Sequence, residues 1–472
     1  MLIKKNKLYQ YIFLLIITLM VIFNGGNNNL YIQFNFIIVS ILFLLFVKEK
    51  NYLAHVRELF SKNKIAIFLF TLFISFLIFQ TIPLPIEWLI IFSPEKYNIL
   101  NKLEFKGSFH SISLSPADSY FNLLNYLTLF LSLIIFKSLF YKKRDIFKFY
   151  YFLVFIGAFA SSVAIYFYLI GNPDFWIIKN ELIKRAATGF FINRTVFACF
   201  LVLCFLSGVE YLKNIDDYKK NDKDNFFNKI YIRIFILLIT IGLITSFSRL
   251  GNFLFISIVI FYILQAFFTN DKKSKFFLIT LILIVLVDVL IFGFYFGSGK
   301  LLQRYSFLAN EVNAYLPSTK EVNTYLPSTK EVNTYLPSTK ELGFIRGDIA
   351  KFALVEFKKF IYWGYGGGGF EYLFKINFEN LSTIYASHAH SDIIEFIGEF
   401  GLIGFTLILS SLLFFCINKN LSTFKNFLLL YLLLFILIFD FSLHIPIIQL
   451  LFVLLISINY KQSKNLEYRV NN

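Results

Sequence analysis

Residues 387–404, SHAHSDIIEFIGEFGLIG, lead directly into a long apolar run that can cross a bilayer as a helix. Asp392 followed by Glu395 resembles a capping box built on a carboxylate, so the helix is expected to begin near the preceding serine. His390 then lies at the positive end of that helix, where the dipole favours the neutral imidazole that a general base needs. The alternative is that His390 and His388 are only polar residues at a membrane interface.

Similar apolar runs recur along the whole chain. Its 472 residues are 57% hydrophobic and 20% aromatic and include 64 Phe, which no soluble globular protein needs. About twelve runs approach the roughly 20 residues that span a bilayer, which predicts an all-α polytopic membrane protein. The predicted transmembrane helices lie near residues 8–23, 30–47, 65–82, 119–136, 149–170, 189–211, 230–247, 251–268, 276–297, 392–416, 426–440 and 445–459.

The basic residues predict the orientation of these helices. The net charge of +16 is spread over short loops rather than along one stripe, which argues against a nucleic-acid partner. Lysine and arginine gather in alternate loops, so the positive-inside rule places both termini in the cytoplasm. Lys4, Lys5 and Lys7 precede an apolar segment as in a signal peptide, but no small-residue cleavage site follows, so an uncleaved first span is expected. All three cysteines lie in apolar runs, which predicts buried thiols and no metal site.

This topology divides the chain into four parts. Residues 1–184 and 185–297 hold transmembrane helices, residues 298–390 form one large outer loop between the ninth and tenth spans, and residues 391–472 hold the last helices and a basic tail. Within the large loop, residues 311–340 repeat the decapeptide Glu-Val-Asn-(Ala or Thr)-Tyr-Leu-Pro-Ser-Thr-Lys three times. A proline in every repeat forbids a continuous helix. We interpret the array as a tolerated insertion, with a dedicated binding role as the alternative.

The rest of the large loop contains two further features. Residues 343–360 can form an amphipathic helix that carries Arg346. The four consecutive glycines at 366–369 can expose backbone N–H groups to an anion. A plain flexible turn explains the glycines equally well.

Polar and charged side chains, which are energetically costly to place in a membrane, cluster on the outer side of the predicted bundle. Charged side chains in apolar segments are functional candidates, although an arginine can also extend to the lipid headgroups. Guanidinium groups match phosphate oxygens with two hydrogen bonds, so we expect an outward-facing pocket for a lipid-linked phosphate or diphosphate. The candidate residues are Arg185, Arg194 next to Asn193, Arg249, Arg346, His388 and His390.

Other motifs are absent or ambiguous. The sequence has no Walker loop, dinucleotide fingerprint or His-Glu-x-x-His zinc helix. Asp222 and Asp224 resemble a nucleotide-sugar metal motif, but they fall in a charged cytoplasmic loop, where solvation explains them better. Asp288, in the ninth span, fits either a relay or a pairing with a neighbouring helix. Asp440 and His444, at the last outer turn, can edge the same pocket.

Four motifs in order resemble the O-antigen ligase and polymerase superfamily of bacterial envelope glycosyltransferases. They cover residues 185–405 and depart from the family pattern at three positions, where Thr195 and Ser391 replace asparagines and Tyr362 replaces a proline. The motifs are Arg185 with Thr188–Ala198, Ser248–Gly251, Arg346 with Gly364-x-Gly366, and His388–Gly404.

The resemblance implies transfer of a glycan from an undecaprenyl-diphosphate carrier to an acceptor hydroxyl, with inversion and without a metal, cofactor or nucleotide sugar. It also implies an inner-membrane protein with its site on the periplasmic face. Arg249 and Arg346 would clamp the diphosphate and stabilise its charge as a leaving group. His390 would take the acceptor proton with help from His388 or Glu399. The outer residues Arg185, Asn193 and Arg194 would assist in binding.

The identity of the acceptor distinguishes several alternative activities. A second lipid-linked repeat unit would make the protein a polymerase, lipid A core would make it a ligase, and a protein side chain would make it an oligosaccharyltransferase. We slightly favour the polymerase. A twelve-span transporter or lipid-linked sugar flippase would place polar groups near the midplane and show paired repeats of its spans, neither of which is seen in the sequence. A non-catalytic scaffold leaves the arginine and histidine cluster unexplained.

Overall fold

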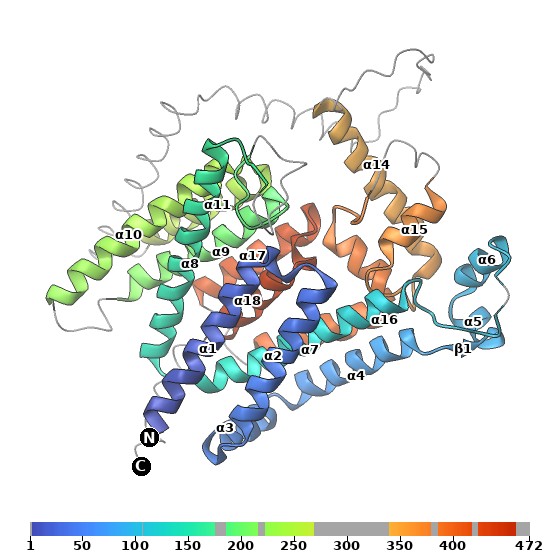
Figure 1. Cartoon of the computed structure of the whole chain (residues 1–472), viewed down its shortest axis with the longest axis horizontal. Helices are drawn as coiled ribbons and strands as arrows, with labels where there is room; N and C mark the ends of the chain where they lie inside the picture. Colours follow the sequence, from blue (N-terminus) through green and yellow to red (C-terminus); the bar gives the residue numbers. More distant parts are fainter. Residues whose placement is uncertain are drawn as a thin grey trace.

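The computed structural model describes residues 2–105, 107–174, 186–215, 222–268, 339–378, 386–417 and 423–458 (Figure 1). The described part is helical apart from a short antiparallel pair, β1 (Leu84–Pro85) and β2 (Phe109–His110), in which Leu84 faces His110. The all-α prediction is therefore confirmed for this part of the chain.

Eight helices of the described part are long and apolar enough to cross a membrane, and three shorter apolar helices accompany them. The eight are α2 (Asn29–Val47), α4 (Lys64–Thr81), α7 (Pro116–Leu139), α8 (Lys143–Leu169), α9 (Arg194–Asn214), α10 (Asp222–Thr245), α11 (Arg249–Phe268) and α16 (Asp392–Ile417). The shorter ones are the part Asn6–Ile22 of α1 (Leu2–Ile22), α17 (Phe424–Phe439) and α18 (Pro446–Ser457). Each overlaps a predicted span; the predicted span at 276–297 lies outside the described residues. A multi-pass membrane protein follows, while the count of twelve and the orientation stay predictions.

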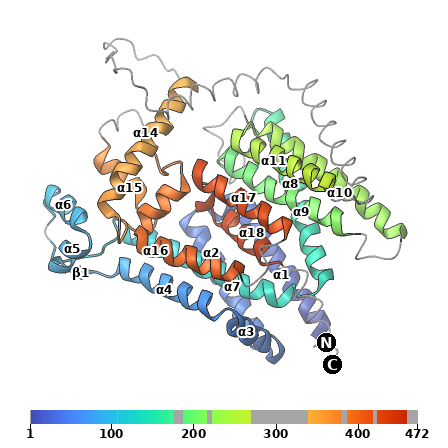
Figure 2. The same ribbon diagram turned by 180° about the vertical axis from the view of Figure 1, so that it is seen from behind.

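The helices form two groups joined by α18, which contacts both α7 and α9 (Figures 1 and 2). One group packs α8, α9, α10 and α11 together, and the other packs α2, α4, α7 and α16. Helix α9 is central, because 94% of its apolar window is buried. Small residues allow the close approach around it: a Cβ added to Gly157 of α8 would lie 2.6 Å from the Cβ of Cys204 on α9.

Hydrogen bonds tie the helix ends at one side of the bundle, which we call the site end. Ile192 N, before α9, donates to Asn24 Oδ1, after α1, at 3.0 Å. Asp392 N, at the start of α16, donates to Asp440 O, after α17, at 2.8 Å. The site end therefore holds the beginnings of α9 and α16 and the ends of α1 and α17.

Two lysines, one of them buried, mark the opposite end. Lys425, at the start of α17, donates from Nζ to Ile458 O at 3.1 Å, just after α18. Lys137, at the end of α7, donates to Ser457 O. Both lysines belong to the loops predicted to face the cytoplasm, so the charge pattern used for orientation has a physical counterpart at this end.

Several smaller elements complete the described part. Helix α3 (Lys50–Lys62) was not predicted, because its sequence is too polar to form a span. Two short helices follow α4 and β1, α5 (Ile86–Phe92) and α6 (Pro94–Lys102). The amphipathic helix expected at 343–360 is α14 (Thr339–Phe357) with the 3-10 turn η2 (Lys358–Phe360), followed by α15 (Phe370–Asn377). Two further 3-10 turns are η1 (Asn24–Gly26) and η3 (Ser442–His444).

The outer elements rest on a separate apolar cluster at the site end. Phe360, Phe370 and Phe374 are buried together with Tyr365 between α14 and α15. Both elements stand beside the beginning of α16 in both views (Figures 1 and 2). Asp222 and Asp224, predicted in a loop, instead form the first turn of α10. Residues 311–338 of the decapeptide array and Asp288 lie outside the described residues, and the last two residues of the array begin α14.

Candidate functional site

Three carboxylates lie on one face of α16 and point into the protein. Asp392, Glu395 and Glu399 follow the i, i+3, i+7 spacing that aligns side chains along a helix. Their exposed fractions are only 0%, 1% and 1%. Burying three such groups is costly unless hydrogen bonds and opposite charges compensate. The compensating groups therefore identify the partners around which this site is built.

The main partner is His444, the last residue of η3. Its Nδ1 bonds to Asp392 Oδ1, and its Nε2 lies 3.3 Å from Glu399 Oε2 and 3.7 Å from Glu395 Oε1. Its ring stacks on Phe396 with the centroids 4.2 Å apart. Burial lowers the pKa of His444, but the three carboxylates outweigh burial and raise the pKa well above its usual value. His444 is therefore held as an imidazolium.

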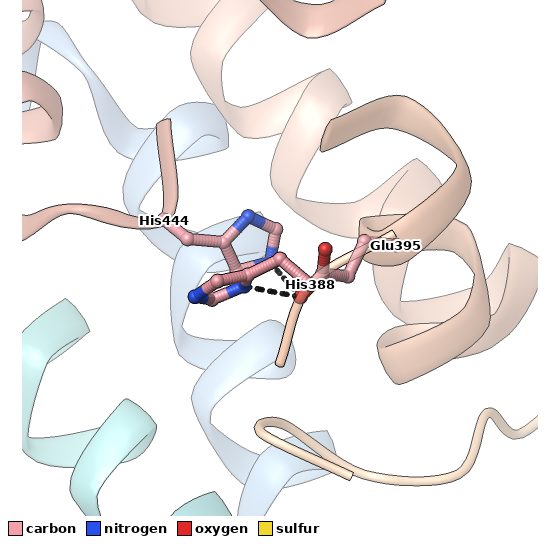
Figure 3. Close-up of side chains that lie close together, drawn as sticks. All are labelled: His388, Glu395 and His444. Carbon is pink, nitrogen blue, oxygen red and sulfur yellow. Dashed lines mark hydrogen bonds and ion pairs between the residues drawn. The ribbon is translucent and has the colours of Figure 1, made fainter. Parts of the chain in front are cut away.

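The second imidazole, His388, meets Glu395 in the same network as His444 (Figure 3). Its Nδ1 lies 2.8 Å from Glu395 Oε1, and its ring stacks on Phe441 at 4.5 Å and 9°. The other oxygen of Glu395 accepts the backbone N–H of Ala389 at 2.8 Å. The side chain of His388 is 23% exposed, whereas that of His444 is 8% exposed. His388 is thus the member that a substrate can reach.

His390, the predicted general base, lies beside this pair. It adopts the left-handed conformation, with φ of 57°, and its ring packs edge-on against Phe441 at 5.5 Å. Its side chain is half-buried. Glu395 holds the ring of His388, so the carboxylate–imidazole pair of the predicted motif uses the first histidine. Sequence spacing alone does not reveal this choice, because it depends on the turn at His390.

The predicted capping box is only partly present. Helix α16 begins at Asp392, one residue after the expected position. Asp392 Oδ2 accepts the N–H of Leu443 at 2.7 Å, so it binds η3 rather than its own helix. Glu395 reaches back to Ala389. The two acids therefore organise neighbouring segments, and the sequence interpretation of Asp392 as a cap was wrong.

The glycine run binds an acid of its own chain. Gly366 N donates to Glu399 O at 2.9 Å, and Gly368 N donates to Glu399 Oε1 at 2.6 Å. This contact is possible because α16 is kinked at Gly401, where φ is 61° and ψ is 179°. Leu402 N then donates to Ile361 O at 2.7 Å. At least part of the predicted anion-binding capacity of the run is therefore used by Glu399.

Helices α4 and α7 support this loop through residues that the sequence analysis missed. Gln80 Nε2, at the end of α4, donates to Trp363 O at 2.6 Å and to Glu399 O at 2.9 Å. Ser119 Oγ, in α7, donates to Gly367 O at 3.0 Å. A glutamine within an apolar helix was the available signal for Gln80, since such a group needs a buried partner.

Three of the predicted arginines lie in helices of the described part. Arg249 is the first residue of α11 and Arg194 the first of α9, and both are half-buried. Close packing of Gly251 on Ala198 brings these two helices together near their beginnings. Arg346 lies in α14, but its side chain is outside the described part.

Two further predicted residues have simple outcomes. Asn193 caps α9, and its Oδ1 accepts the N–H groups of Thr195 at 2.7 Å and Val196 at 3.4 Å. A structural role therefore accounts for its carbonyl oxygen. Arg185 lies outside the described residues.

One group in the described part has the donor types of a metal site. The ligand atoms of His388, Glu395 and His444 lie within 4.8 Å of one another, and two histidines with a glutamate can bind zinc. However, both oxygens of Glu395 already accept hydrogen bonds, one from His388 Nδ1 and one from the N–H of Ala389. Asp392 and Glu399 are likewise engaged by N–H groups at both oxygens. A hydrogen-bonded network therefore accounts for the arrangement.

Fold and site together define a multi-pass helical membrane protein with a buried histidine–carboxylate network at one end. Residues 234–409 match the family described as O-Antigen ligase. The match confirms the predicted resemblance to the O-antigen ligase and polymerase superfamily over this part of the chain. It includes Arg249, the two histidines of the motif and Glu399, whereas Arg194 and His444 fall outside it. The comparison with curated proteins finds no match.

Proposed function

We propose that the protein is an integral membrane glycosyltransferase of surface-polysaccharide assembly. It moves a glycan from an undecaprenyl-diphosphate carrier to an acceptor hydroxyl at the periplasmic face of the inner membrane. The family match supports this reaction class. The observation that carries the proposal is the His388–Glu395 pair, because it places a carboxylate-held imidazole at the partly exposed edge of a buried network.

The reaction needs a base for the acceptor hydroxyl. As the oxygen attacks the anomeric carbon and the bond to the diphosphate breaks, the hydroxyl proton must move to a protein group. Glu395 holds Nδ1 of His388 and thereby leaves Nε2 as the position for that proton. His390, to which the sequence assigns this task, packs edge-on against the same Phe441 ring on which His388 stacks. The two histidines act as a pair in this proposal, and mutation of each assigns the base.

The leaving diphosphate needs positive charge. Arg249 and Arg346 supply it as two-pronged donors, with Arg185, Asn193 and Arg194 assisting. The reaction requires no metal or nucleotide sugar, because the carrier diphosphate is already an activated leaving group. The placement of Arg249 and Arg194 at the first residues of two packed helices supports this role, since helix N-termini favour phosphate.

We favour a polymerase, in which the acceptor is a second lipid-linked repeat unit. Transfer to lipid A core or to a protein hydroxyl uses the same donor chemistry and is the alternative. A flippase is disfavoured because the ionised network of the described part sits at one end of the bundle instead of at its middle.

Complementation of glycan-deficient strains tests the proposal. The wild-type protein is compared with His388→Ala, His390→Ala and the control His110→Ala, which changes a histidine of β2 bonded to Gly107 O. Long lipopolysaccharide ladders that collapse to a single-repeat band in a site variant would establish a polymerase. Attachment of ready-made chains to the core, lost in the same variant, would establish a ligase. Undiminished transfer by both site variants would remove the histidines from the mechanism and favour the transporter.

A further inference from the structure

His444 lies outside the family match and touches every acid of the site. We propose that His444 is a positioning residue, whose charged ring fixes Glu395 against His388 and Glu399 against the glycine run. One buried side chain would then determine both the position of the base, His388, and the position of the glycine run beside it. This inference rests on the proposed function for its consequence in catalysis, but not for the charge network itself.

The ring of His444 is placed to act in two directions. Nδ1 is bonded to Asp392, which also holds the N–H of Leu443 and so anchors η3 on α16. Nε2 faces Glu399 at 3.3 Å and Glu395 at 3.7 Å. Stacking on Phe396, with 18° between the ring planes, prevents the imidazole from turning away. Because only 8% of its side chain is exposed, His444 acts through the acids.

Each acid passes this constraint to a different part of the site. Glu395 bonds to His388 through the same oxygen that faces His444. Glu399 divides its two oxygens between Gly368 N–H and His444. The rings of His388 and His444 lie 5.5 Å apart, so Glu395 is the bridge between them. A change in the charge of His444 therefore reaches His388 through one intervening group.

The surroundings explain why the charge matters. Tyr126 on α7, Tyr365 beside the glycine run and Cys199 on α9 face these acids, and side chains of these types cannot supply a compensating positive charge. Asp440, just before η3, accepts a hydrogen bond from Ser442. Without the imidazolium, three carboxylates on one helix face would repel one another, and a carboxylate in such a group takes up a proton at higher pH. A protonated Glu395 no longer holds His388 as a base.

The test uses the full-length protein in lipid nanodiscs with a lipid-linked glycan donor. His444→Gln is compared with Gln449→Leu, a control that removes a buried polar contact to Asn125 from the neighbouring helix α18. We expect His444→Gln to lower kcat about tenfold or more at pH 7 while KM for the donor changes about twofold or less. In the plot of kcat against pH, the pH below which the variant loses activity should rise by about one unit, so that activity recovers at higher pH. Gln449→Leu should leave the pH dependence of kcat unchanged.

A second readout is independent of transfer. The chain has five histidines, so selective labelling of histidine nitrogen allows each ring to be followed by nuclear magnetic resonance. We expect the ring of His444 to remain protonated above pH 7 and the signal of His388 to change its pH dependence in His444→Gln. If these signals behave as expected in a protein that shows no transferase activity, the proposed function is contradicted and the charge network of His444 is not.

Three results would overturn the positioning role. One is a neutral His444 ring at pH 7. Another is an equal loss of activity at every pH with a fall in thermal midpoint, which would indicate a structural role only. The third is stoichiometric zinc in the purified protein that is lost in both His444→Gln and Glu395→Gln, because the cluster would then be a metal centre.

Discussion

Glu399 Oε1 accepts the backbone N–H of Gly368 at 2.6 Å, so the glycine run holds an acid that comes from α16. The second oxygen of Glu399 faces His444 at 3.3 Å. One carboxylate therefore joins the outer loop, the kinked helix α16 and the turn η3. This connection makes the loop a fixed wall of the site rather than a flexible turn.

Replacing Glu399 with Gln should separate its two contacts. The amide oxygen can still accept the N–H of Gly368, but the negative charge facing His444 is lost. We expect a fold of nearly wild-type thermal midpoint and a fall in glycan transfer of about tenfold or more. Glu399→Ala removes both contacts and should also lower the midpoint. Transfer at the wild-type level in Glu399→Gln would show that only the loop contact matters.

The kink at Gly401 predicts that substitution of this glycine lowers the stability of the protein. Its backbone combination, φ 61° and ψ 179°, is essentially restricted to glycine, and a Cβ there would clash with Tyr362 O. Gly401→Ala should destabilise the protein by about 1–3 kcal/mol more than Gly171→Ala. Gly171 is a matched control because its φ is also positive, at 87°, while an added Cβ meets no described atom within 4 Å. Thermal unfolding in detergent measures both, and equal midpoints would show that the backbone relaxes at the kink.

The sequence predicted the helices better than the contacts between them. Apolar runs are a local signal, so the helix beginning at Asp392 was placed within one residue. His388 and Glu399 were identified from the motif, yet their partners depend on packing between distant segments. Glu399 meets His444 from 45 residues away and Gln80 from 319 residues away. Local periodicity carries no information about such pairs, and this limited the site prediction.

Lys425 should stabilise the end of α18. Its buried Nζ donates to Leu455 O, which also accepts the N–H of Ile458, and to Ile458 O, just after the helix terminus. Lys425→Met should cost about 1–3 kcal/mol of stability, because these acceptors lose a buried donor. The control Lys375→Met removes an exposed ion pair with Glu371 and should cost less than about 1 kcal/mol. A smaller effect at Lys425 than at Lys375 would contradict the capping role.

Lys96 predicts a pH dependence of stability. It lies in α6, outside the spans, and burial lowers its pKa to about 8, while in the unfolded chain the value is 10.5. Between these values the unfolded state binds more protons, so stability rises with pH as Lys96 becomes neutral in the folded protein. The rise is on the order of 3 kcal/mol. Lys96→Met should reduce the rise by about this amount when stabilities at pH 7 and pH 10.5 are compared, whereas an unchanged rise would assign it to other groups.

The arginines provide the most direct test of diphosphate binding. Arg249→Lys and Arg346→Lys keep the positive charge but lose the planar fork that contacts two phosphate oxygens at once. We expect each to reduce transfer about tenfold or more. Arg57→Lys, in the polar helix α3, is the matched control and should leave transfer unchanged. Donor binding should weaken in parallel, which separates a clamp on the carrier from a role in folding. If both site variants transfer glycan as well as the control does, neither arginine clamps the diphosphate.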